Sequence, residues 1–551
     1  MSERRRFWLF ALAGFLILLA LPASVRNLHF VIDDWEFLQL PFFNSTTHAI
    51  IGAIYRKLRV GREIYMILEA KLFGMDRQAM MFVSVALHGL NAVLFGLCVR
   101  GALPGRPRLA IAATGLAIAF PPFLAMTYFA IDSTRLPLLF TFLAVLSLQA
   151  WASKGGQGRL AFAAAAYFIG LTFYENAIFF AVVLPVAALP VLTADTGALW
   201  SRRVILRFAA MTGSVALGGA AFLIYRYLIG FSDSGRTETA SLPAPGYLLD
   251  SFQPLLGFLL QPLWDIRPDP AGLLAGLALS LALLAALWPA GRPAVSTPRE
   301  VLFVALAGLA LLIAGLLPYW LIHQDIHVAW TTEARVFSSA GYGVILLLAL
   351  PAGFLGAGVI RKPLALATAT VAFLWLAFGF GLRLDWEKAA DRHCLLWKSL
   401  LEQAPFVTEN TVFVIAGLRE RNERAIVFGG SDSLLVLIRM LYKYPGAADR
   451  VYGFHLDEGL KILSAQTSSG RGQSQRAGVI PSDAILLVQR HGDRLDIVDR
   501  IDTLSPPPTM ETSPASAIAS NRSRIMTNLP GLPGIDERLA RLSIHCPDAP
   551  R

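Results

Sequence analysis

Residues 29–36, HFVIDDWE, place two adjacent carboxylates shortly after an apolar run that is long enough to cross a lipid bilayer. Carboxylates such as Asp33 and Asp34 can take a proton from a hydroxyl group or bind a divalent cation, and an aspartate can also cap the helix that follows it. Other charged residues stand at the ends of later apolar runs, at Asp132, Arg135 and Glu175. Because charge near the membrane interior is costly, the set favours a shared polar cavity, although each residue could instead belong to a solvated surface pair.

The chain has more apolar sequence than the core of one soluble domain could bury. Of the 551 residues, 55% are hydrophobic and only 16% are charged, and the mean hydropathy is +0.56. We therefore expect a polytopic α-helical membrane protein in contact with the lipid bilayer. The net charge of +10 does not predict a nucleic acid partner, because much of the basic excess lies in short connections between apolar runs.

The sequence contains about eleven apolar runs of nearly membrane-spanning length. They cover residues 7–25, 79–99, 109–129, 136–152, 160–174, 176–193, 208–229, 271–290, 301–320, 336–356 and 363–383. The first run resembles a signal peptide, since Arg4, Arg5 and Arg6 precede it, but the ten later runs favour an uncleaved anchor.

The distribution of Lys and Arg predicts the orientation. Basic residues gather in alternate connections between the runs, with few acids among them. The positive-inside rule then places the N-terminus in the cytoplasm and the connection 26–78 on the outer face of a plasma (inner) membrane. The candidate residues for chemistry lie on that outer side.

The composition changes after residue 383. Charged residues become frequent, the stretches 411–418 and 483–490 are typical of strands, and 431–444 is typical of a helix. We divide the chain into a membrane domain, 1–383, and a soluble α/β domain, 384–551, in the periplasm or outside the cell. If that compartment is oxidising, Cys394 and Cys546 could form a disulfide.

The long outer connection has a helical pattern of its own. Segments 36–58 and 60–75 mix apolar residues at helical spacing with Arg, Lys and Glu. This mixture is typical of helices that lie at a membrane interface. Such helices would cover the site beside Asp33.

The carboxylate pair after the first span, the outer juxtamembrane helices and the outer soluble domain together resemble the GT-C superfamily of membrane glycosyltransferases. Within that superfamily, GREIYMILEAKLFGMDRQAMMFVSVALHGLNAVLF (61–95) is similar to the tetratricopeptide-type protein O-mannosyltransferases and their bacterial relatives, although no such repeats follow here. The matching residues are Arg62, Gly74, His88 and Asn91, and Glu175 stands at the Lys-Glu position of the family.

The resemblance implies transfer of a hexose such as mannose from a polyprenyl-phosphate sugar to a hydroxyl group of a glycan, lipid or protein in the cell envelope. Asp33 would be the general base, with Asp34 and Asp132 as further catalytic acids and Asp33 and Asp132 as ligands of a possible divalent metal ion, Mg²⁺ or Mn²⁺. The substrate-binding residues would be Arg62, Arg135, Glu175, Arg335 and His88.

The alternative is a multi-span transporter of a lipid or a polar solute. Transporters usually place polar residues and broken helices near the bilayer midplane, whereas the acids here gather at one face.

Overall fold

The computed structural model describes residues 2–25, 27–30, 34–35, 38, 46–47, 50, 59–125, 132–194, 201–228, 252–265, 269–288, 297–321, 337–354, 360–418, 420–422, 425–428, 431–443, 451–455, 484–500, 519–526 and 533–547. The chain divides into two compact units. The first contains Met1–Ser24, Thr47–Met66 and Ala79–Arg383, and the second contains Val25–Thr46, Ile67–Gln78 and Leu384–Arg551.

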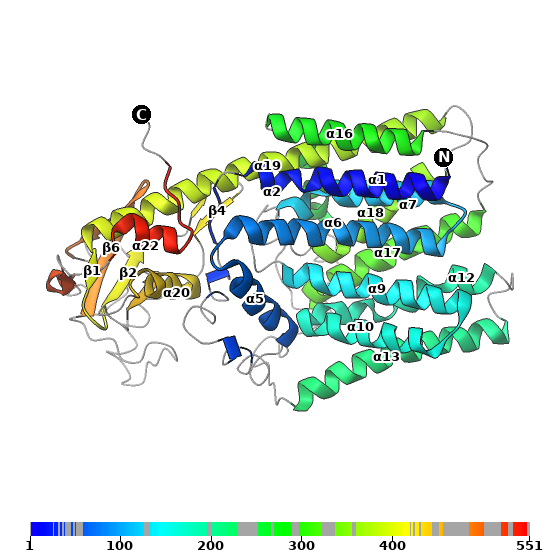
Figure 1. The fold of residues 1–551 in the computed structure, drawn as a ribbon, viewed down its shortest axis with the longest axis horizontal. Coiled ribbons are helices and arrows are strands. Elements are labelled where there is room, and N and C mark those ends of the chain that lie inside the picture. Colours follow the sequence, from blue (N-terminus) through cyan, green and yellow to red (C-terminus); the bar gives the residue numbers. More distant parts are fainter. Residues whose placement is uncertain are drawn as a thin grey trace. The chain divides into compact units, whose positions relative to one another are not determined.

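The first unit is helical (Figure 1). Its helices are α1 (Glu3–Leu18), α2 (Ala20–Ser24), α7 (Pro107–Ala119), α8 (Pro121–Ala125), α9 (Asp132–Lys154), α10 (Gln157–Phe173), η2 (Glu175–Ala181), α11 (Val183–Val186), α12 (Leu189–Ala194), α13 (Arg202–Leu228), α15 (Phe252–Leu260), η3 (Gln261–Leu263), α16 (Pro270–Leu287), α17 (Pro298–Leu321) and α18 (Phe337–Phe354).

Three further helices contribute residues to both units. They are α5 (Val60–Phe73), α6 (Arg77–Ala102) and α19 (Arg361–Gln403). Helix α5 lies within the segment 60–75 that the sequence predicts to be helical, whereas most of the predicted helical segment 36–58 lies outside the described residues.

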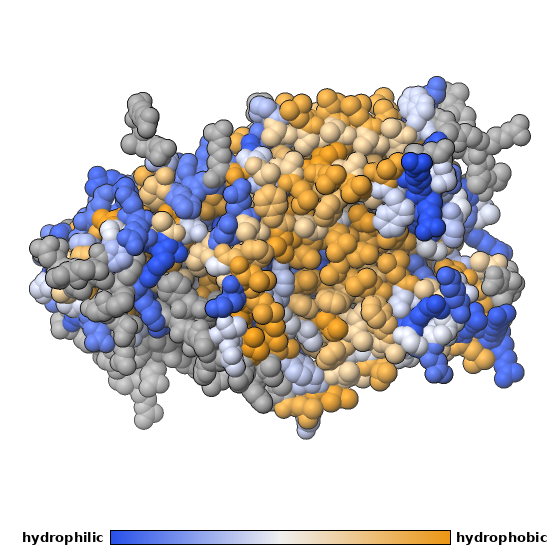
Figure 2. Space-filling model, viewed as in Figure 1, coloured by the Kyte–Doolittle hydropathy of each residue, from blue (hydrophilic) through white to orange (hydrophobic). Residues whose placement is uncertain are grey.

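The chain is a helical membrane protein. Among the described residues, seven helices are long and apolar enough to cross a membrane, or eight if the bent pair Glu175–Ala181 and Val183–Ala194 forms one span. Helices overlap all eleven predicted runs, but α7 has only 13 residues, so the count of eleven spans stays a prediction. Figure 2 shows apolar side chains covering the flank of these helices, as contact with lipid requires.

The second unit contains a small sheet of four strands in the order β5-β2-β6-β7. The described strands and helices of the second unit, besides the shared helices, are β1 (Phe406–Val407), β2 (Val412–Ala416), β3 (Glu420–Asn422), β4 (Ala425–Phe428), α20 (Ser431–Leu441), β5 (Tyr452–His455), β6 (Ile485–His491), β7 (Arg494–Val498), η9 (Arg522–Arg524), β8 (Ile525–Met526) and α22 (Ile535–Arg541).

Strand β2 forms the centre of this sheet. It pairs in parallel with β5 and β6, so that Val414 lies opposite Phe454 and Leu487, and β7 returns antiparallel beside β6. All five residues of β2 are buried, as expected for a parallel strand covered on both faces. The two predicted strands and the predicted helix at α20 are therefore confirmed.

A disulfide joins Cys394 of α19 to Cys546, over a sequence separation of 152 residues. Close by in sequence, the buried Arg538 of α22 donates hydrogen bonds to the carbonyl oxygens of Leu441 and Pro405. These bonds attach the C-terminal segment to the rest of the second unit. The third cysteine, Cys98, is buried and free.

Blocking thiols in unreduced, denatured protein should therefore modify one of the three cysteines, and reduction should expose two more. Mass spectrometry of protein alkylated at cell lysis measures the count. A Cys394→Ala variant is the control, because it should leave Cys98 and Cys546 both reactive before reduction. Modification of all three cysteines in the unreduced, denatured wild-type protein would contradict the disulfide.

Candidate functional site

The HFVIDDWE motif belongs to the second unit, where its described residues are buried. His29, Phe30, Asp34 and Trp35 are each at most 3% exposed. Asp33, the predicted general base, lies outside the described residues. It is bracketed in sequence by residues whose positions are fixed by the core of the second unit.

Ring contacts hold this motif against α19. The ring of His393 lies 4.6 Å from the ring of His29 and 6.1 Å, nearly parallel, from that of Trp35. Trp397 donates its indole N–H to His393 Nε2 at 3.0 Å, which makes Nε2 the acceptor nitrogen of a neutral imidazole. Two rings of the motif, those of His29 and Trp35, therefore pack on His393 of α19.

In the first unit, Asp132 accepts three hydrogen bonds while fully buried. Tyr65 of α5 donates to Oδ2 at 2.9 Å, and Ser84 of α6 and Arg135 of α9 donate to Oδ1 at 2.5 and 3.2 Å. The carboxylate thus connects three helices, and the buried negative charge is matched by a buried guanidinium.

Arg135 is itself held from several sides. Its guanidinium also donates to Ser84 Oγ and, at 3.0 Å, to the carbonyl oxygen of Phe123. The amide of Asn91 donates to the Arg135 carbonyl oxygen at 2.8 Å. The structure therefore brings Asp132 and Arg135 together as an internal ion pair.

His88 lies in the same helix as Asn91 and is 2% exposed. Its Nε2 is 3.3 Å from the carbonyl oxygen of Ile118, and its ring packs edge-on against Phe123 at 5.0 Å. These contacts connect α6 to α7 and α8. They give His88 a packing role beside the Asp132 group.

A second polar group forms where α5 begins. Arg59 binds Glu175 with two hydrogen bonds, of 2.7 and 2.5 Å, and its guanidinium lies 4.3 Å from the centre of the Tyr174 ring. Burial lowers the pKa of Arg59, but the hydrogen bonds and charge of Glu175 raise that pKa above its ordinary value. Glu175 is therefore an ion-pair partner of an arginine that the sequence analysis did not select.

Arg62 lies one helical turn after Arg59 and donates to Glu63 Oε1 at 3.0 Å. Burial and the neighbouring Arg59 charge lower the pKa of Arg62. Gly61 lets this turn approach α10 closely, because a Cβ atom there would collide with Thr172 Oγ1. A bound anion would relieve the repulsion between the two guanidinium groups.

Arg59, directly before α5, and the first turns of α5 thus connect both polar groups, since Arg59 bonds to Glu175 and Tyr65 bonds to Asp132. Among the predicted residues, Asp132, Arg135, Arg62 and Glu175 belong to this arrangement in the first unit, Asp34 belongs to the second unit, and Asp33 and Arg335 are not described. The sequence analysis missed Arg59, Tyr65 and Ser84. The spacing of Arg59, Arg62 and Tyr65 by three residues, on one helix face, is the signal that could have found two of them.

The structure describes one of the two predicted metal ligands, Asp132. Within the described residues there is no group of three His, Cys, Asp or Glu side chains that could hold a metal ion, and Asp33 lies outside them. Asp132 would have to give up a bond to Tyr65, Ser84 or Arg135 to bind a cation. Metal binding by Asp33 and Asp132 stays a prediction.

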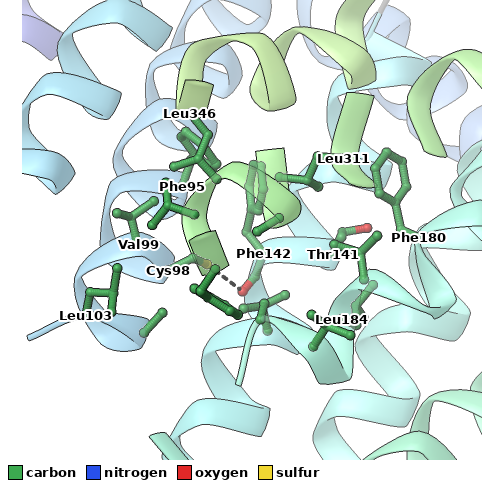
Figure 3. A pocket seen from close by; sticks show the side chains of 18 residues that line it. Phe95, Cys98, Val99, Leu103, Thr141, Phe142, Phe180, Leu184, Leu311 and Leu346 are labelled. Atoms are coloured by element: carbon green, nitrogen blue, oxygen red, sulfur yellow. Dashed lines mark hydrogen bonds between the residues drawn. The ribbon is translucent and has the colours of Figure 1, made fainter. Parts of the chain in front are cut away.

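The first unit also holds an apolar cavity of about 80 Å³ (Figure 3). Phe95 and Cys98 of α6, Phe142 of α9, Leu184 of α11, Leu311 of α17 and Leu346 of α18 line it. The Cys98 thiol makes a hydrogen bond of 3.6 Å to the carbonyl oxygen of Phe142. Such a lining, almost wholly apolar, suits a hydrocarbon chain.

No family model and no curated protein matches this chain. The resemblance to GT-C glycosyltransferases therefore stays a prediction.

The variant Asp132→Asn should lower the free energy of unfolding by about 3–5 kcal/mol, because it leaves the Arg135 guanidinium buried without its counter-charge. Tyr65→Phe is the graded comparison and should cost about 1 kcal/mol, since it removes one hydrogen bond and keeps those from Ser84 and Arg135. Unfolding of the purified protein in detergent, titrated with denaturant, measures both. Stability of Asp132→Asn within about 0.5 kcal/mol of the native protein would refute the structural role of this ion pair.

Proposed function

We propose that the chain is a membrane glycosyltransferase that moves a sugar from a polyprenyl-phosphate donor to an acceptor hydroxyl group on the outer face of the membrane. The observation that carries the proposal is the fixed frame around HFVIDDWE. Four residues of this motif are buried, and two of its rings pack on His393. A general base must be held within reach of the proton that it takes, and rigid neighbours serve that purpose.

In the proposed reaction, Asp33 takes the proton of the acceptor hydroxyl group while the oxygen of that hydroxyl group attacks the anomeric carbon of the donor sugar. A new bond forms between the acceptor oxygen and that carbon, and the bond from the carbon to the phosphate oxygen breaks. Polyprenyl phosphate leaves with the bonding electron pair. One displacement inverts the anomeric configuration.

Asp34 supports Asp33 in this scheme. Its side chain is fully buried, so it acts on the orientation of the motif and not on the acceptor directly. Asp132 also has a positioning role, because its oxygens are occupied by Tyr65, Ser84 and Arg135. It holds α5, and with it Arg62, in place.

Arg62 is the proposed contact for the phosphate of the donor. It is partly buried and lies near a second guanidinium, that of Arg59, and burial and this neighbouring charge both lower the pKa of Arg62. A phosphate anion is the natural partner for closely placed guanidinium groups, which offer it forked donors. Arg335, which lies outside the described residues, is a second proposed phosphate contact.

The proposed location is the plasma (inner) membrane, with the N-terminus in the cytoplasm and the second unit on the outer side. The disulfide between Cys394 and Cys546 supports this orientation, since disulfides persist in oxidising compartments. The positive-inside distribution of Lys and Arg supports it independently.

A reporter that is active only in the periplasm, fused after Arg551, should therefore be active, and a fusion in the basic connection after Lys154 should be silent. Paired fusions to a reporter active only in the cytoplasm provide the control and should give the reverse pattern. Cytoplasmic activity at Arg551 would overturn the orientation.

Asp33→Asn should reduce sugar transfer by about 10²–10⁴-fold, because asparagine keeps the size of the side chain but cannot take the proton. Transfer from radiolabelled polyprenyl-phosphate hexose in proteoliposomes measures the effect. Binding of the lipid donor should persist, which separates loss of chemistry from loss of substrate.

The matched control is Asp499→Asn, at an exposed carboxylate of the second unit that pairs with Arg522. This variant should transfer sugar at the native rate. If Asp33→Asn does so as well, Asp33 is a helix cap, since asparagine caps as well as aspartate, and the proposed base is refuted.

A further inference from the structure

The second unit contains a polar pocket of about 350 Å³ that the proposed reaction does not use. Three segments far apart in the sequence surround it, at residues 25–28, 75–78 and 543–545. The lining residues are Val25, Asn27, Leu28, Met75, Asp76, Arg77, Gln78, Ser543 and His545.

The three segments are bonded to one another. The side-chain amide nitrogen of Asn27, Nδ2, donates to the carbonyl oxygen of His545 and to Asp391 Oδ1, both at 2.9 Å. Ser543 Oγ donates to the carbonyl oxygen of Met75. The disulfide fixes Cys546, the residue after His545, to α19. The walls are therefore cross-linked, and the shape of the pocket is set before any ligand enters.

The side chains that line the pocket mix hydrogen-bond donors and acceptors. Among the residues that line the pocket, the exposed Asp76, Gln78 and His545 carry a carboxylate, an amide and an imidazole, and the buried Arg77 carries a guanidinium. Neither sign of charge dominates, as it would at a phosphate site or a metal site. Apolar wall atoms come from Val25, Leu28 and Met75.

A hydroxyl-rich ring matches this mixture best. Each hydroxyl group both donates and accepts a hydrogen bond, so it can use the carboxylate of Asp76, the amide of Gln78 and the imidazole of His545 in turn, while the C–H faces of the ring contact the apolar wall. The volume lies near the lower end of the range of about 300–1,000 Å³ found for small-molecule pockets, which suits one or two sugar rings.

We propose that this pocket binds a saccharide, and that this saccharide is part of the acceptor. The second half of the proposal rests on the proposed glycosyltransferase function. The first half concerns binding alone and needs no transfer.

The test uses full-length protein in detergent micelles and saturation-transfer difference NMR. The probes are the methyl α-glycosides of glucose, galactose and mannose and the corresponding α-linked disaccharides. At least one probe should receive saturation. The double variant Asp76→Ala/His545→Ala should weaken its binding about tenfold or more, because both side chains supply hydrogen bonds to the ligand.

The control double variant is Asp499→Ala/His491→Ala. It removes the same two residue types from exposed positions of the same unit, outside the pocket, and should bind as the native protein does. Because Asp76 and His545 are exposed as well, both double variants should keep the disulfide and the folded core.

Three results would overturn the proposal: no saturation of any probe, equal binding by the native protein and the Asp76→Ala/His545→Ala variant, or displacement of the sugar by inorganic phosphate, which would identify an anion site. If no sugar binding is found, the transfer assay on Asp33→Asn still tests the proposed glycosyltransferase function. Absence of transfer, conversely, leaves sugar binding measurable.

Discussion

The buried ion pair between the Asp132 carboxylate and the Arg135 guanidinium constrains how α5, α6 and α9 pack in the first unit. Two buried charges are tolerated only when each is well hydrogen-bonded, and here Tyr65 and Ser84 also donate to the carboxylate. This requirement places the first turns of α5 beside α6 and α9. This placement also positions Arg62, which lies in the first turn of α5, and Arg59, which directly precedes α5.

The second unit applies another constraint to the acidic motif. His29 and Trp35 lie against His393, so the chain on either side of Asp33 is attached to α19 by large buried rings. Aromatic side chains bury a large area and lose little conformational freedom, which makes them suitable for anchoring the residues that carry them. The proposed chemistry depends on that rigidity more than on the number of acids near the membrane.

The sequence predicted the features that depend on local pattern. Strand β2 reads as a continuous apolar run because it is buried on both faces. The sequence offered Asp132 and Arg135 as part of a polar cavity or as a solvated surface pair, and the structure shows a buried ion pair three residues apart on α9. The sequence could not predict contacts that depend on the path of the chain. The bond from Arg59 to Glu175 joins residues 116 positions apart, and the bond from Asn27 to Asp391 joins residues 364 apart.

For the same reason, the sequence analysis treated the outer loop as part of the membrane domain, whereas Val25–Thr46 and Ile67–Gln78 group with the second unit. The disulfide was one possibility among several until the packing of α19 brought Cys394 to Cys546. Asp132 shows a further limit, since a lone acid at the end of an apolar run looks the same whether it takes a proton or holds three helices together.

The central claim is that the native chain transfers a sugar. The direct measurement incubates the purified protein in proteoliposomes with radiolabelled polyprenyl-phosphate hexoses and a panel of glycan, lipid and peptide acceptors. The proposal predicts labelled acceptor in an amount equal to the polyprenyl phosphate released, with the anomeric configuration inverted. Folded protein, with its disulfide intact, that gives no transfer from any donor but moves a labelled solute across the bilayer would contradict it and identify a transporter.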